Sequence, residues 1–162
     1  MLSRIGPFSV FLLWLSAPAV SPAAEPPPTV VAFNGYALEV PSGFCIQTRR
    51  GPDFVVRYLR SGGLTGPILA GAYTGFAPDF RPDCANPTKR SWTAKALSFE
   101  SVRGADGCAE FLVRDPKKET RGVLHVWFGP DAKANRTLAE KMVDSIAPAD
   151  KAAGDVEPLA CK

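Results

Sequence analysis

Apolar and polar residues alternate along several short stretches of the chain, a period of two that is typical of β-strands with one buried face. The first two stretches are residues 30–33 (VVAF) and 36–40 (YALEV), and Asn34-Gly35 separates them. Asn-Gly suits the type I′ turn of a tight hairpin, because both central residues of that turn need a positive φ. The sequence therefore predicts an N-terminal β-hairpin that ends at Pro41.

Further strands are expected at residues 44–48, 54–58, 68–73, 97–102, 108–113 and 122–128. In the second of these, Phe54, Val56 and Tyr58 share one face and Arg57 lies on the other, which predicts a half-buried strand. The last run, GVLHVWF, is apolar on both faces, which predicts a central strand that is covered on both sides.

Two segments are not predicted to be strands. Prolines at positions 78, 82 and 87 exclude a regular element from residues 76–90, and residues 91–97 are expected to form a short helix or an irregular lead-in. A C-terminal helix is predicted from about residue 131 to residue 146, because Leu138, Met142 and Ile146 recur every four residues. Asp131 or Asn135 is expected to cap it.

The pattern as a whole predicts an α+β fold, an antiparallel sheet of five to seven strands with the C-terminal helix packed on it, in one globular domain over residues 25–148. The composition agrees, since 46% hydrophobic and 22% charged residues exclude intrinsic disorder. Sixteen prolines and fourteen glycines favour a turn-rich sheet protein over a helical bundle.

Residues 1–24 are typical of a cleaved secretory signal peptide, with Arg4 before a short apolar run, FSVFLLWL, and small residues after it. Cleavage is expected after Ala19, Ala23 or Ala24. The apolar run is shorter than the roughly 20 residues that a membrane span needs, so the protein is expected to be periplasmic or secreted, without a membrane span.

Cysteine usage is consistent with an oxidising compartment. The four cysteines, Cys45, Cys84, Cys108 and Cys161, all follow the leader. None has the C-x-x-C spacing of a zinc or thioredoxin-type motif, so two structural disulfides are expected. Three pairings are open. We favour Cys84–Cys108 with Cys45–Cys161, since the second bond would tether the aperiodic C-terminal tail, residues 149–162.

The order of elements also carries a resemblance to a known family. A hairpin ending in Tyr36-x-Leu38-x-Val40-Pro41-x-Gly43-Phe44 opens the domain, and a final helix closes it at Val143-Asp144-Ser145-Ile146. This order resembles the PsbP/Mog-like α/β/α sandwich. The resemblance implies an accessory or binding role without a common active site, and it assigns no functional residue.

The segment before Cys84 holds the candidate binding residues. Prolines and a disulfide would preorganise aromatic and arginine side chains, the residue types that most often anchor interfaces. The candidates are Phe76, Asp79, Phe80, Arg81 and Asp83. The alternative is an ordinary covering loop whose phenylalanines pack inward.

His125 is the one histidine of the chain and lies within a predicted strand, sharing a face with Val123 and Trp127. It is expected to be a packed, hydrogen-bonded residue; the catalytic alternative makes it a general base beside Glu110 or Asp115. A single histidine and no free thiols leave few ligands, so neither a metal nor a cofactor is expected.

The net charge of the chain limits the classes of partner that it is expected to bind. The chain carries a net charge of +3 and no long basic run, which argues against binding to nucleic acid. The function that the sequence favours is an exported, non-enzymatic binding or accessory protein that acts on an envelope protein or a small ligand. An inhibitor or immunity protein is a special case of it. The alternative is a small periplasmic hydrolase or isomerase that uses His125 with a carboxylate.

Overall fold

The main layer of the protein is a seven-stranded antiparallel sheet. The computed structural model describes residues 26–75, 79–80, 84–118, 122–129, 132, 135–149 and 159–162. The strand order of the sheet is β3-β4-β5-β9-β8-β7-β6. Its strands are β3 (Phe44–Arg50), β4 (Val55–Ser61), β5 (Ile68–Gly75), β6 (Thr88–Ala94), β7 (Leu97–Arg103), β8 (Ala109–Arg114) and β9 (Val123–Phe128).

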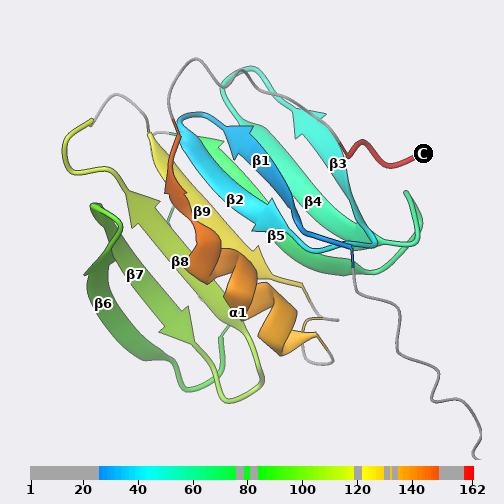
Figure 1. Ribbon diagram of the computed structural model, residues 1–162. Coiled ribbons are helices and arrows are strands. Elements are labelled where there is room, and N and C mark those ends of the chain that lie inside the picture. The colour runs from blue at the N-terminus through cyan, green and yellow to red at the C-terminus, as the bar shows by residue number, and fades with distance from the viewer. Residues whose placement is uncertain are drawn as a thin grey trace, which may run out of the picture.

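A second layer covers one face of this sheet. It consists of a small sheet of β1 (Thr29–Phe33), β2 (Tyr36–Val40) and β10 (Ala147–Pro148), beside the helix α1 (Arg136–Ser145). Figure 1 shows the β1–β2 hairpin and α1 lying next to each other over the seven-stranded sheet. The hairpin turn is as predicted, with φ of 49° at Asn34 and 83° at Gly35.

The hydrophobic core fills the space between the two layers. From the main sheet it takes every second residue of β8 and β9, for example Phe111 and Val126, and from the covering layer it takes residues such as Leu38 and Met142. We call this face of the main sheet the inner face. The hydroxyl of Tyr36, which is fully buried, donates a hydrogen bond of 2.9 Å to the carbonyl oxygen of Gly122 and so ties the layers together.

The predicted fold class is confirmed in outline: an antiparallel sheet carries a C-terminal helix. The described residues are nevertheless more β-rich than predicted, with ten strands in two sheets. The prediction of a short helix or irregular lead-in at 91–97 is wrong. That segment belongs largely to β6, which pairs with β7 along its whole length, and Trp92 stacks on Phe99 at 5.1 Å between ring centroids. Tertiary packing explains a strand whose local pattern was ambiguous.

The alternation expected in β4 is confirmed, but its orientation is the reverse of the ordinary one. Arg57 is only 2% exposed and lies on the inner face, in register with Ala72. The half-buried face carries Val56 and Tyr58. A charged residue at an inner position is rare, and alternation alone cannot show which of two faces is covered.

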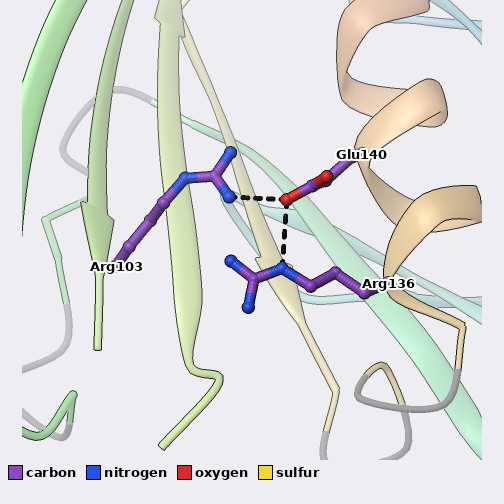
Figure 2. A network of polar contacts seen from close by, with 3 residues as sticks. All are labelled: Arg103, Arg136 and Glu140. Atoms are coloured by element: carbon purple, nitrogen blue, oxygen red, sulfur yellow. Dashed lines mark hydrogen bonds and ion pairs between the residues drawn. The ribbon is translucent and has the colours of Figure 1, made fainter. Parts of the chain in front are cut away.

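The helix begins later than predicted, at Arg136, and Asn135 occupies the N-cap position without a side-chain cap bond. Asp131 lies outside the described residues. Figure 2 shows how α1 is held against the sheet: Glu140 lies between Arg136, one turn earlier, and Arg103 of β7. The Oε1 atom of Glu140 accepts bonds of 2.6 Å from Arg103 and 3.1 Å from Arg136. These arginines lower the pKa of the Glu140 carboxyl, Arg103 more strongly than Arg136.

Both favoured disulfides are present, Cys45–Cys161 with a Cα–Cα distance of 4.9 Å and Cys84–Cys108 with 5.4 Å. The first holds residues 159–161 against the edge strand β3. There the N–H of Ile46 donates to the carbonyl of Leu159 at 2.6 Å, and the N–H of Cys161 donates to the carbonyl of Ile46 at 3.0 Å. The predicted tether of the C-terminal tail is thus confirmed at its end, and it covers part of an edge that would otherwise expose backbone groups.

The predicted signal peptide, residues 1–24, lies outside the described residues. Within the part of the chain that the structure describes, no helix is long and apolar enough to cross a membrane.

Candidate functional site

The outer face of the main sheet, opposite the helix, carries a row of aromatic side chains. The strand register brings Tyr58, Gly71 and Trp127 into one cross-strand line. The neighbouring line contains Tyr73 and His125. Because alternate residues of a strand point to one side, all these side chains leave the sheet away from the core. We call Phe54, Tyr58, Tyr73, His125 and Trp127 the aromatic face.

The rings of this face form two groups, Phe54 with Tyr73 and Tyr58 with Trp127 and His125. Ring centroids lie 6.2 Å apart for Phe54 and Tyr73, 5.4 Å for His125 and Trp127, and 6.2 Å for Tyr58 and Trp127. These separations are in the range of favourable aromatic pairs. The two groups are neighbours on the sheet, because Tyr73 is the direct cross-strand partner of His125.

Two glycines of β5 make room for the rings. A Cβ atom at Gly71 would collide with the indole of Trp127, and one at Gly75 would collide with the phenol ring of Tyr73. Glycine inside a strand normally weakens it, so its presence here marks a close approach of another group to the backbone. The side chains of Trp127 and Tyr73 therefore lie over the backbone of β5.

The aromatic face is accessible at several positions. Phe54 is 38% exposed, and Tyr58, Tyr73 and Trp127 are half-buried. Arg49 and Arg60 both lie over the ring of Tyr58, with guanidinium carbons 5.8 Å and 6.0 Å from its centroid.

Arg60 is held in place by hydrogen bonds to Gln47 Oε1 at 2.9 Å and to the Gly66 carbonyl at 2.6 Å. Arg49 is exposed. One half of the face thus combines aromatic rings with two cations.

Beside the rings lies a buried acid–base pair. His125 Nε2 and Glu110 Oε2 are 2.9 Å apart, and their side chains are 8% and 1% exposed. His125 therefore is the packed, hydrogen-bonded strand residue that we expected. Of the two carboxylates considered as its partner, Glu110 is the one in contact; the Asp115 carboxylate instead accepts a bond of 2.9 Å from the N–H of Lys117.

The Cys84–Cys108 disulfide adjoins this pair. The two sulfur atoms and a carboxylate oxygen of Glu110 all lie within 4.8 Å of one another. Cys84 and Glu110 are buried, whereas Cys108 is half-buried. Polar chemistry is therefore concentrated where β8 begins, next to the aromatic face.

Only part of the predicted binding loop is described. Phe80 is half-buried and stands edge-on to the His125 ring, with centroids 6.4 Å apart and an interplanar angle of 90°. Asp79 is exposed, and its carboxylate accepts a bond of 2.8 Å from the N–H of Phe80. Phe76, Arg81 and Asp83 lie outside the described residues. The described part of the loop thus borders the aromatic face.

A cavity of about 290 Å³ lies next to Phe54, which lines it together with Gly75 and with Arg57 and Thr74 from the inner face of the sheet. Small-molecule sites typically enclose about 300 to 1,000 Å³, so this cavity is at the lower limit of that range.

Sequence reasoning did not single out Tyr58, Tyr73 and Trp127 as site residues. Their alternation was visible, but a half-buried aromatic residue in a strand is ordinarily core. A usable signal was the pair of glycines inside the predicted strand at 68–73 and just after it, because glycine there indicates a close approach. Comparison with family models, with curated proteins and with solved structures found no match to this chain.

Proposed function

We propose that this protein is an exported binding or accessory module that captures a protein partner through its aromatic face. The observation that carries the proposal is two neighbouring groups of aromatic rings on the side of the sheet that the helix layer leaves uncovered, in which Phe54 is exposed and Tyr58, Tyr73 and Trp127 are half-buried. Tyrosine, tryptophan and arginine are the residue types most enriched among the residues that dominate binding energy at interfaces.

The shape and charge of the face favour a protein partner with an acidic rim. The rings lie over the sheet and form a broad surface, whereas small ligands prefer concave, enclosing sites. The two charged side chains stacked on Tyr58 are both arginines. A partner that places carboxylates around an apolar centre would complement this arrangement.

The predicted export of the protein is consistent with the proposed binding role. Two disulfides are typical of proteins in oxidising compartments, and the sequence of residues 1–24 is typical of a secretory leader. The loop residues Phe76, Asp79, Phe80, Arg81 and Asp83 are part of the proposal as a border of the binding surface, since Phe80 contacts His125.

The test is capture from the cell envelope with three forms of the mature protein. Wild type and a Lys89→Ala control, which changes an exposed residue of β6, are expected to retain the same envelope protein. Tyr58→Ala is expected to lose it while keeping a single cooperative melting transition, because Tyr58 is half-buried on the outer face and not part of the core. Equal retention by all three forms, or no retained protein with wild type, would contradict the proposal.

A second candidate is the hydrolase or isomerase that uses His125 as a general base, and the 2.9 Å contact with Glu110 is the observation in its favour. The burial of both side chains and the Phe80 ring against His125 weigh against it, because a general base must reach substrate. Turnover of a panel of model esters and amides that His125→Gln abolishes would support this candidate, and turnover that His125→Gln leaves unchanged would remove it.

A further inference from the structure

The Cys84–Cys108 disulfide differs from Cys45–Cys161 in what surrounds it. Its sulfurs lie within 4.8 Å of a carboxylate oxygen of Glu110, which in turn contacts His125 Nε2 at 2.9 Å. Cys45–Cys161 instead joins an edge strand to the C-terminal tail. The spacing of the cysteines in sequence cannot reveal this difference, because Glu110, His125 and Cys84 come from three separate segments of the chain.

We infer that Cys84–Cys108 is a redox-active disulfide that exchanges with external thiols, and that the Glu110–His125 pair exchanges the proton with the buried sulfur. Disulfide exchange requires a thiolate that attacks one sulfur and a second sulfur that leaves. The leaving sulfur gains a charge, which burial disfavours, so a proton donor beside it speeds the step. The buried pair next to these sulfurs supplies that proton.

Burial decides which sulfur reacts first. Cys108 is half-buried and Cys84 is buried, so we assign the attack of the incoming thiolate to Cys108 Sγ, the sulfur of the more exposed residue. A bond forms between the incoming sulfur and Cys108 Sγ, the bond between the two protein sulfurs breaks, and its electron pair passes to Cys84 Sγ. Cys84 Sγ takes a proton from the Glu110–His125 pair, which recovers one from solvent.

A second external thiolate completes the reduction. It attacks the external sulfur of the mixed disulfide, releases the external disulfide, and leaves Cys108 as a thiolate that is protonated by solvent. Two external thiols are thus oxidised to one disulfide, and the protein disulfide gains two electrons and two protons. In the reverse direction the carboxylate of Glu110 accepts the proton of the Cys84 thiol, which then attacks the mixed disulfide. The inference does not depend on the aromatic face being a binding surface.

The test measures reduction of each disulfide separately in the intact mature protein, with reduced glutathione as the probe. Freed thiols are alkylated at time points and located by mass spectrometry, and Cys45–Cys161 serves as an internal control in every sample. Glu110→Gln is expected to slow the reduction of Cys84–Cys108 about tenfold, which is less than the rate enhancement that general acid catalysis typically supplies. The reduction of Cys45–Cys161 is expected to stay unchanged. Glu100→Gln, an exposed carboxylate on β7, is the matched control and is expected to change neither.

The pH dependence separates proton transfer from a structural role. The rate of reduction of Cys84–Cys108 is divided by the concentration of glutathione thiolate at each pH. In the wild type this quotient is expected to rise as pH falls, and in Glu110→Gln it is expected to stay constant. His125→Gln provides the same comparison if Glu110→Gln has no cooperative melting transition. Unchanged or faster reduction in Glu110→Gln would overturn the inference, since a faster rate would mean that the carboxylate merely repels the incoming thiolate.

Discussion

The indole of Trp127 on β9 lies over Gly71 on β5, in the space that a side chain at position 71 would occupy. The glycine at position 71 of β5 therefore determines where the side chain of Trp127 on the neighbouring strand β9 lies. With a larger residue at position 71, the indole would have to turn away from the sheet, and its contacts with Tyr58 and His125 would be lost.

Gly71→Val is therefore expected to disrupt the aromatic face. Overpacking of this kind costs about 1–3 kcal/mol, and we expect a loss of stability in that range together with loss of partner capture. Denaturant unfolding followed by Trp fluorescence measures both the stability and the environment of the indole. Ser91→Val, at an exposed strand position, is the control; equal stability of the two variants would contradict the close contact at Gly71.

The Glu110–His125 pair is expected to show strong energetic coupling. Glu110→Leu leaves His125 buried without its carboxylate partner, and an unsatisfied buried polar group should cost about 1–3 kcal/mol. The double variant Glu110→Leu with His125→Leu should be less destabilised than the sum of the two single variants, because it leaves no buried polar group behind. A double-mutant cycle by urea unfolding measures the coupling, and additive effects would show that the contact contributes nothing.

Glu140 is expected to make the docking of α1 sensitive to acid. Its folded pKa is lowered below the usual 4.5 by hydrogen bonds from Arg103 and Arg136. A lowered folded pKa contributes stability that is present above the unfolded pKa and is lost as pH falls through the folded pKa. The carboxylate is 37% exposed, so the contribution is small, under about 1 kcal/mol.

Glu140→Gln should accordingly be slightly less stable than wild type at pH 7 and indistinguishable from it at pH 2. Urea midpoints at both pH values measure the difference. A difference that persists at pH 2 would show that Glu140 acts through packing of its stem and not through its charge.

The Cys45–Cys161 bond is expected to protect the edge strand β3. Replacing both cysteines with alanine should cost about 2–4 kcal/mol. The replacement should also allow the hydrogen bond from the Ile46 N–H to the Leu159 carbonyl, which is 2.6 Å long in the intact protein, to open more often. Native-state hydrogen exchange at Ile46 reports this directly, with faster exchange expected in the variant and unchanged exchange in the centre of β9. Equal protection at Ile46 in both proteins would show that the tail binds β3 without the disulfide.

Local patterns were sufficient to predict most strands and the N-terminal hairpin, and the disulfide pairing that we favoured among three is the one present. Asn34-Gly35 has one strongly preferred turn, and the aperiodic sequence of residues 149–162 favoured a bond that anchors Cys161. The prediction for residues 91–97 was wrong because no local pattern distinguishes an exposed edge strand from an irregular lead-in. Pairing with β7 is what makes most of this segment a strand.

The candidate site was predicted only in part. The contact of His125 with Glu110 was among the alternatives, because both lie in predicted strands, but the aromatic face was missed. Alternation of apolar and polar residues separates the two faces of a strand, but it does not show which face the helix covers. In the structure Arg57 lies on the inner face and Tyr58 on the outer face. The resemblance to PsbP/Mog-like domains stays a prediction.

Site-specific photo-crosslinking in intact cells tests the central claim most directly. A photoreactive phenylalanine analogue would replace Tyr58 on the aromatic face or, as the control, Ser91 on β6. We predict one discrete adduct of a single envelope protein from position 58, lost when Gly71→Val is added, and none from position 91. No adduct from position 58, or the same adducts from both positions, would contradict a binding role for the aromatic face.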